Sequence, residues 1–191
     1  MISIIPTTSQ NTRLQIVGDI SRFAPPLKKL ETPDERVAMF IDSSNLFFSC
    51  KKLGIRHDLN VYLTLRERFG ADKVFVYMSL NPASESEKLL IRALRRNKFR
   101  VWVKPIIQRP DGTKKGNLDV EMALSVMEQS SLYDRIVLLS GDGDFCILVR
   151  RLRQQDKHVT VVGLNYMTSP LLKRQANRYI DLESIFRREA S

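Results

Sequence analysis

The stretch VLLSGDGDF, Val137 to Phe145, joins an apolar run to a pair of carboxylates and indicates how the chain folds. The run has the composition of a short strand that is buried on both faces, and apolar residues at helical spacing begin directly after it. Asp142 and Asp144 stand at the junction, separated by one glycine. In open α/β folds, ligands bind outside the carboxyl ends of the parallel strands. The stretch therefore predicts an α/β protein with an acidic site at that edge of the sheet.

The same order of strand and helix extends in both directions along the chain. Short apolar runs predict strands at 37–41, 73–80, 100–105, 135–140 and 158–164. Helical spacing of apolar residues predicts helices at 60–69, 84–97, 117–130 and 145–155. Ser84 and Glu87 have the spacing of a capping box at the start of one of them. Strands that alternate with helices in this way form a mostly parallel central sheet with helices on both faces.

The first part of the chain differs from the rest in composition. Residues 1–34 contain the polar TTSQNT, the Pro pair of APPLKK and part of the turn-like ETPDE, so we expect an N-terminal extension followed by one domain over 35–191. No apolar run approaches the roughly 20 residues that cross a bilayer, and the N-terminus lacks the pattern of a secretory signal. Cys50 and Cys146 have neither disulfide nor metal-ligand spacing. We expect a cytoplasmic protein with no membrane partner.

The charge of the chain is strongly positive and unevenly placed. The formal net charge is +10, and the segment from Lys88 to Lys115 is rich in Lys and Arg with a single acid, Asp111. Clustered cations attract polyanions and release counterions when they bind them. The charge therefore favours a nucleic-acid partner over a merely solvated surface.

Acidic residues stand out at three places against this basic background. Asp42 follows the first strand in FIDSSN, Asp119 lies in the first turn of a predicted helix in KGNLDVE, and Asp142 follows the fourth strand. Neighbouring first and fourth strands would bring Asp42 and Asp142 together, and the helix of Asp119 directly precedes the fourth strand. Carboxylates gathered in one cleft repel each other unless a cation is present, and Mg²⁺ prefers such oxygen ligands. This arrangement predicts a divalent metal site that acts on a phosphate.

Each acid also has a purely structural interpretation. Asp144 could cap the following helix, and Asp119 could be an ordinary acid that the helix dipole favours, with Asn117 as the cap. Asp42 is harder to explain structurally, because a carboxylate at the end of a buried strand loses solvation. Gly141 and Gly143 suit a close approach of the backbone to a substrate.

Four segments resemble a known family. The segments VAMFIDSSNLF, KKGNLDVEMALSVME, DRIVLLSGDGDFCILVRRLRQQDKHVTVVGL and, more weakly, SPLLKRQANRYIDL resemble NYN domains, a branch of the PIN-like nucleases, and within them the bacterial LabA-like group. The resemblance spans roughly 37–182. It implies a three-layer α/β/α sandwich, a Mg²⁺- or Mn²⁺-dependent acidic site and ribonuclease activity.

The resemblance also implies roles for particular residues. Asp42, Asp119 and Asp142 match the metal-binding acids, Asn45, Ser140 and Asp144 match supporting residues, and Lys115 precedes the middle acid as in relatives. Two positions depart from the family pattern. Many members carry a further acid on the helix after the middle aspartate, near the position of Ser125, and an aspartate near the end of the domain, where this chain has Asn177.

Two functional hypotheses follow, and they differ in whether the site turns over a substrate. The first is a metal-dependent endoribonuclease on single-stranded or structured RNA, with Asp144 as an additional catalytic acid. The cations that we expect to hold the RNA backbone are Lys114, Lys115, Arg95, Arg96 and Arg100. The second is a non-catalytic RNA-binding or regulatory protein with a weakened acidic site.

Some partners and alternatives stay open in the sequence. Trp102 and Tyr166 could stack on bases or could simply pack in the fold. A homodimer, and protein partners of the N-terminal extension, are also open. A haloacid-dehalogenase phosphatase or a Toprim domain fits less well, because the first would need an acid at Ser44 and the second a glutamate at Asp42.

Overall fold

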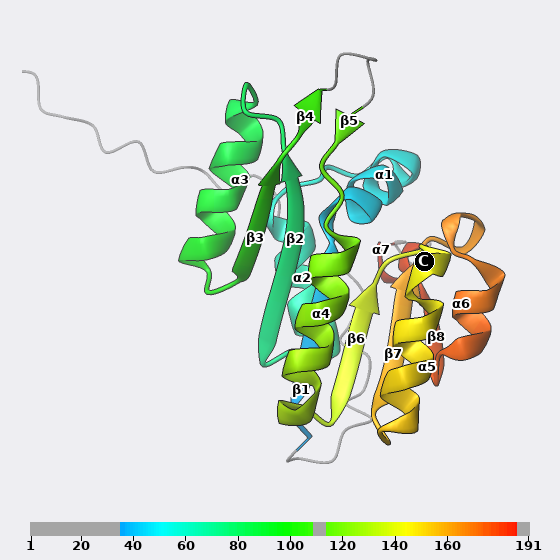
Figure 1. The fold of residues 1–191 in the computed structure, drawn as a ribbon. Coiled ribbons are helices and arrows are strands. Elements are labelled where there is room, and N and C mark those ends of the chain that lie inside the picture. The colour runs from blue at the N-terminus through cyan, green and yellow to red at the C-terminus, as the bar shows by residue number, and fades with distance from the viewer. Residues whose placement is uncertain (1–34, 109–113, 187–191) are drawn as a thin grey trace, which may run out of the picture.

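One sheet of six parallel strands forms the centre of the molecule (Figure 1). The computed structural model of the chain describes residues 35–108 and 114–186, and the predicted extension 1–34 lies outside them. The strand order is β3-β2-β1-β6-β7-β8, so β1 lies beside β6, as the sequence required for its acids to meet. The strands are β1 Val37–Asp42, β2 Lys73–Leu80, β3 Arg100–Pro105, β6 Arg135–Leu139, β7 His158–Gly163 and β8 Arg178–Asp181.

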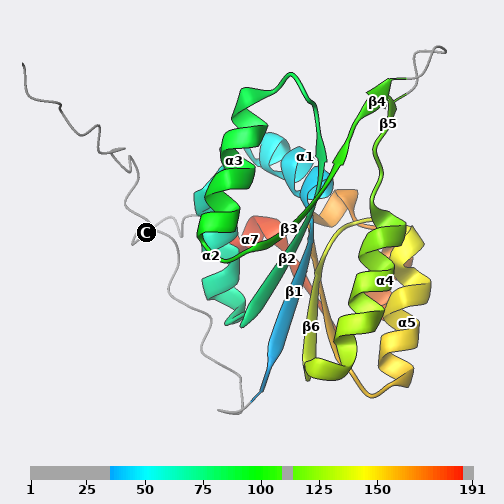
Figure 2. The ribbon, with the colours of Figure 1, turned by 60° about the vertical axis from the view of Figure 1, so that its left-hand side comes forward.

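Helices cover both faces of the sheet, which confirms the predicted three-layer α/β/α sandwich. On one face lie α1 Ser43–Leu53, α2 Leu59–Phe69, α3 Glu85–Arg96 and α7 Leu182–Phe186. On the other face lie α4 Asp119–Gln129, α5 Cys146–Gln154 and α6 Pro170–Gln175. Figure 2 shows α2 and α3 on one side of the sheet and α4 and α5 on the other.

The central strand β1 shows why this sequence builds a two-sided core. Val37, Met39 and Ile41 point into the cluster under α1, α2 and α3, whereas Ala38 and Phe40 point into the cluster under α4 and α5. All five side chains are fully buried. Because successive side chains of a strand point to opposite faces, burial on both sides requires an uninterrupted apolar run, and VAMFI supplies it.

The predicted strands and helices are present, but the sequence analysis omitted several elements. It gave no helix at α1, no strand at β8 and no antiparallel hairpin of β4 (Ile107–Gln108) with β5 (Lys114–Lys115). The short helices α6 and α7 were also omitted. Helix α1 exposes Phe47 and Phe48, which blurs its apolar stripe, and β8 is an edge strand with no fully buried residue. In both elements the local pattern is weak, and pairing or packing with the rest of the fold stabilises them.

Two further expectations concern the cysteines and the membrane. Both cysteines are free and buried, and burial raises the pKa of Cys50 to about 12, so its thiol is held in the unreactive protonated form. Within 35–108 and 114–186, none of the helices has the length and apolar content needed to span a bilayer.

Candidate functional site

A cavity of about 510 Å³ opens at the carboxyl edge of the sheet, between the end of β1 and the start of α4. Asp42, Asp119 and Asp142 all line it. They come from three separate places in the chain: the last residue of β1, the first residue of α4 and the loop after β6. The fold thus brings the three predicted metal-binding acids to one hollow.

Asp42 is fixed by the start of α1 and by the neighbouring strand. Its Oδ1 accepts hydrogen bonds from the backbone N–H groups of Ser44 (3.0 Å) and Asn45 (3.1 Å), so it caps α1. Its Oδ2 accepts a bond of 3.3 Å from the Ser140 hydroxyl, which is itself fully buried. Burial raises the pKa of Asp42, the bonds from Asn45, Ser140 and Ser44 oppose this, and the charge of Asp119 raises it further.

Asp119 is oriented by the residue two positions before it. The Asn117 amide nitrogen donates to Asp119 Oδ2 at 2.5 Å, and Asn117 Oδ1 accepts from the backbone N–H of Asp119 at 2.7 Å. The predicted cap lies one residue too early, because the N-cap of α4 is Leu118, and Asn117 binds the backbone N–H of the first helical residue instead. Burial raises the pKa of Asp119, the Asn117 bond lowers it, and the charges of Asp142, Asp144 and Glu121 raise it again. Asp119 is therefore close enough to these three acids for their negative charges to repel its own.

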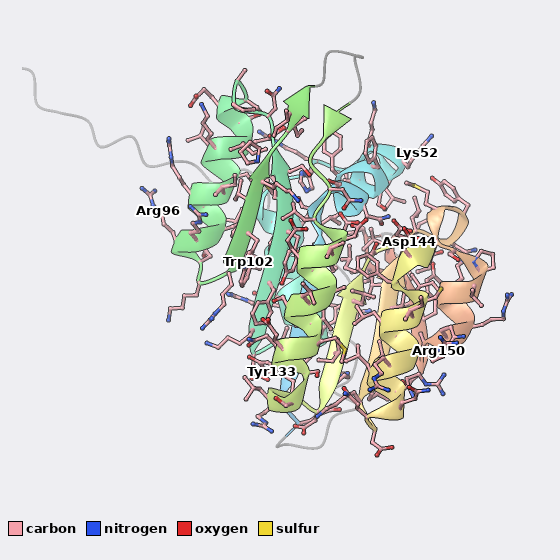
Figure 3. All side chains as sticks on the ribbon, in the orientation of Figure 1. Lys52, Arg96, Trp102, Tyr133, Asp144 and Arg150 are labelled. Carbon is pink, nitrogen blue, oxygen red and sulfur yellow. The ribbon has the colours of Figure 1, made fainter. Side chains whose placement is uncertain are left out.

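Asp142 and Asp144 have different roles in the loop after β6. Asp142 Oδ1 accepts from the backbone N–H of Asp144 at 2.9 Å, and the N–H of Asp142 donates to the Ser140 hydroxyl at 3.2 Å. Asp142 therefore caps the 3-10 turn Gly143–Phe145 that leads into α5. Asp144, labelled in Figure 3 near the start of α5, is exposed and does not line the cavity. The proposed capping role of Asp144 is thus filled by Asp142.

The cavity also contains a buried oxygen with no partner. Asn45 Oδ1 has no hydrogen-bond partner within the described chain, and Asn45 lines the cavity beside Asp42. An unpaired buried carbonyl oxygen is costly unless something else binds it. The oxygens of Asn45 and of the three aspartates form a hard, all-oxygen donor set, which suits Mg²⁺ or Mn²⁺.

The acids are not arranged as a ready-made metal cage. Within residues 35–108 and 114–186, no group of three or more His, Cys, Asp or Glu side chains has the arrangement that would hold a metal ion. Like charges hold carboxylates apart when no cation lies between them.

The other acids of the neighbourhood do not enlarge the cluster. Glu121 forms an ion pair with Lys104, and Glu128 is exposed. Ser125 is buried on α4, where the resemblance implied an acid. Asn177 lies at the amino end of β8, where its Oδ1 accepts from the N–H of Val159 at 2.9 Å, at the opposite edge of the sheet. The site therefore has three acids.

Glycine is needed at position 141 for a reason other than the predicted contact with a substrate. A Cβ at this position would lie 2.5 Å from the backbone oxygen of Met167, and the Gly141 oxygen accepts a bond of 2.9 Å from the N–H of Ser169. The glycine therefore allows the loop after β6 to pack closely against the segment that contains Met167 and Ser169. At Gly143 a Cβ would meet only the Ser169 hydroxyl, at 3.1 Å.

The predicted RNA-binding cations lie on three different elements, α3, β3 and β5. Arg95 and Arg96 are exposed at the end of α3, where Figure 3 shows Arg96 pointing away from the sheet. Arg100 begins β3 and lies on the opposite face of that strand, over Phe75. Lys114 and Lys115 form β5, but their side chains lie outside the described part.

Sequence reasoning missed several residues of the cavity. These include Ser79, whose hydroxyl donates to the Gly116 oxygen at 2.6 Å, and Tyr77, which pairs with Asp42 across β1 and β2. Asn117 was predicted only as a helix cap. The available signal was position, because Ser79 and Tyr77 lie at the carboxyl end of a predicted strand. Asn117 precedes Asp119 by two residues, which is the spacing of a side chain that caps a backbone N–H.

Comparison with known proteins assigns the chain to a family. The NYN domain family profile matches residues 36–183, and the chain belongs to this family. The chain is 31% identical over 160 residues to the low amplitude and bright protein LabA of Synechococcus elongatus, which covers 78% of this chain and 85% of LabA. A crystal structure of a protein of unknown function from Vibrio parahaemolyticus superimposes with a TM-score of 0.69 at 30% identity, covering 82% of this chain and 99% of that one.

Proposed function

We propose that the protein is a metal-dependent ribonuclease that hydrolyses RNA phosphodiester bonds in the cavity of Asp42, Asp119 and Asp142. The observation that carries the proposal is the convergence of these three carboxylates beside Asn45 Oδ1, which has no hydrogen-bond partner in the described part of the chain. Membership of the NYN family supports the nuclease class. A net charge of +10 on a chain with an acidic cavity supports a polyanionic substrate held against a cation site.

Each residue of the cavity would have a defined task. Asp42, Asp119 and Asp142 would hold Mg²⁺ or Mn²⁺, with Asn45 Oδ1 as a further oxygen ligand. When bound, such an ion supplies Lewis-acid chemistry, which activates water and neutralises charge on a phosphodiester. Ser140 and Asn117 would keep Asp42 and Asp119 in place through the bonds described above. Asp144 lies outside the lining and would act through its charge on Asp119.

Cleavage of a labelled RNA by purified protein tests the proposal. Wild type and Asp142→Asn would be incubated with a fluorescent single-stranded RNA in Mn²⁺, in Mg²⁺ and in EDTA. Cleavage should require metal and should fall at least 100-fold in Asp142→Asn, because loss of a metal-holding charge removes the ion or misplaces it.

Asp156→Asn is the matched control for this assay. Asp156 is exposed at the turn before β7, remote from the cavity, and its positive φ of 56° is one that asparagine adopts readily. This variant should cleave as wild type does. Equal cleavage by Asp142→Asn and wild type would show that the activity comes from elsewhere and would refute the proposed site.

A non-catalytic RNA-binding regulator is the second candidate. The observation that favours it is the small number of acids, since Glu121 is paired with Lys104 and Ser125 replaces an expected acid. In the same assay, RNA binding that falls with salt but produces no cleavage in either metal would support this function over the nuclease.

A further inference from the structure

The edge strand β3 has one face that the helices of the described chain cover only in part. Val101 and Val103 pack into the core beneath α3. Arg100, Trp102 and Lys104 alternate with them and point to the other face, where α4 and α5 pack over β1, β2, β6 and β7. Trp102 is 39% exposed there, and Figure 3 shows it on the open part of the sheet between α3 and α4. We refer to Arg100, Trp102 and Lys104 as the β3 row.

A ladder of stacked rings holds Trp102 rigidly. Its ring is stacked on Tyr77 with centroids 5.3 Å apart and an interplanar angle of 16°, and it lies 5.8 Å from the Phe75 ring. Phe75 is in turn stacked on the buried Phe40 at 4.6 Å and 5°. Because the neighbouring rings already restrain the exposed indole, it has little conformational freedom to lose when a flat ligand stacks on it.

Basic residues precede and follow Trp102 along β3, at alternate positions whose backbones are about 6.6 Å apart. The Arg100 guanidinium lies 6.0 Å from the Phe75 ring and has no ion-pair partner in the part of the chain that the structure describes. Lys104 Nζ donates to the Asn117 oxygen at 3.1 Å and pairs with Glu121. An aromatic platform between positive charges is the arrangement that binds unpaired nucleotides, with the base on the ring and phosphates on the cations.

The β3 row leads directly to the acidic cavity. Tyr77 stacks on Trp102 with its ring and also lines the cavity. Lys104 bonds to Asn117, and Asn117 orients Asp119. A chain lying along the row from Arg100 toward Lys104 therefore arrives at the carboxylates.

We propose that the β3 row binds single-stranded RNA, with a base stacked on Trp102, and guides the strand into the cavity. This inference rests on the proposed function and specifies its substrate as single-stranded. A duplex does not fit the row, because its bases are already paired and stacked and do not offer a face to an indole. Charge complementarity and continuity with the cavity favour nucleic acid over a protein partner as the occupant.

The tryptophan itself provides the test, because the chain contains one Trp. Full-length protein in EDTA, which prevents cleavage, would be titrated with a 12-nucleotide oligouridylate, with a 12-base-pair RNA duplex and with inorganic polyphosphate. Oligouridylate should quench the tryptophan emission, with a midpoint equal to the Kd from anisotropy of a labelled copy. Polyphosphate should bind without quenching, since it has charge but no bases, and the duplex should not quench either.

Substitution of Trp102 separates stacking from packing. Trp102→Leu keeps an apolar cover and should weaken oligouridylate binding about 5- to 150-fold, whereas Trp102→Phe should retain most of the affinity. Thermal unfolding of both variants would show that they are folded. If Trp102→Leu does not fold, Trp102→Phe and the quenching of the wild type still decide the matter.

Three outcomes would overturn the inference. The first is tryptophan emission that stays unchanged while oligouridylate saturates the protein. The second is a Trp102→Leu variant that binds oligouridylate with wild-type affinity. The third is emission that changes only with protein concentration, which would indicate that this face is an interface between copies of the chain. Failure of the proposed function is distinguishable from these. Quenching without any metal-dependent cleavage would refute the nuclease but support RNA binding by the β3 row. Metal-dependent cleavage without quenching would support the nuclease but refute RNA binding by the β3 row.

Discussion

Asp42 serves the fold and the site with the same carboxylate, and the two roles oppose each other. As the cap of α1 it satisfies two backbone N–H groups. As a buried charge near Asp119 it costs stability, and its raised pKa expresses that cost. Asparagine caps a helix about as well as aspartate but carries no charge. Conflict between stability and function is expected where a site gathers like charges.

Asp42→Asn should therefore change the response to metal. In EDTA the variant should melt at the same temperature as wild type or higher, because the cap stays and the repulsion is removed. Mn²⁺ at ten times its Kd should stabilise wild type by about 1.4 kcal/mol, or roughly 3 to 6 °C, and should shift the variant much less. Differential scanning fluorimetry with and without Mn²⁺ measures this, with Asp156→Asn as the control. Equal shifts in Asp42→Asn and wild type would place the ion elsewhere.

At the scale of elements, a small polar cluster ties α1 to α2 beneath the site. The Tyr62 hydroxyl lies 2.7 Å from the Ser43 hydroxyl and 2.8 Å from His57 Nε2, which joins the first turn of α1, the connecting loop and α2. Burial lowers the pKa of His57 to about 4, although the charge of Asp58 acts against this. His57 is therefore neutral in the folded protein at pH values where it would carry a proton in the unfolded chain.

This difference predicts acid sensitivity in the α1–α2 connection. The unfolded state binds the extra proton between about pH 6.5 and the folded value near 4, so the stability contributed by neutral His57 is present above that window and is lost as the pH falls through it. Between pH 7.5 and pH 5 the loss should be about 2 kcal/mol. Urea unfolding of wild type and His57→Gln at both pH values isolates it, because Gln does not titrate. A variant that loses as much stability as wild type would assign the acid sensitivity to other groups.

At the scale of the whole molecule, position matters more than net charge. The chain carries 31 Lys and Arg against 21 Asp and Glu, yet three of the acids line one cavity and cations lie on every layer. Arg96 and Arg100 are four residues apart in the sequence, but only Arg100 is on the open face that leads to the acids. A basic composition therefore predicts the class of ligand, and the fold selects which cations can contact it.

The salt dependence of RNA binding tests this selection. Each phosphate contact with single-stranded RNA adds about −0.7 to the slope of log K against log salt concentration. Arg100→Gln should reduce the magnitude of that slope by about 0.7. Arg151→Gln removes the same charge from α5, which lies beyond α4 from the β3 row, and should leave the slope unchanged (Figure 1). Anisotropy titrations at several salt concentrations give both slopes, and equal changes in the two variants would indicate binding by diffuse charge.

The sequence by itself determined the parts of this protein that depend on local pattern. Continuous apolar runs specified the buried strands, helical spacing specified α2, α3, α4 and α5, and their alternation specified a parallel sheet covered on both faces. Asp42 and Asp142 could be assigned to one edge because both follow such strands. These features depend on residues that are close together in the sequence, so they could be predicted without knowing any tertiary contact.

The tertiary structure alone decided what depends on residues that are far apart in the chain. It formed α1 and β8 despite weak local patterns and paired Glu121 with Lys104. It made Asp142 the cap of the 3-10 turn before α5, and it left Asn45 Oδ1 without a partner among the residues that the structure describes. It also left Trp102 partly exposed, because the helices on that face pack over β1, β2, β6 and β7 and contact β3 through the Lys104–Glu121 ion pair. The physical reason is that burial, charge pairing and uncovered surface are properties of the packed arrangement, and local periodicity does not record which neighbours a side chain meets.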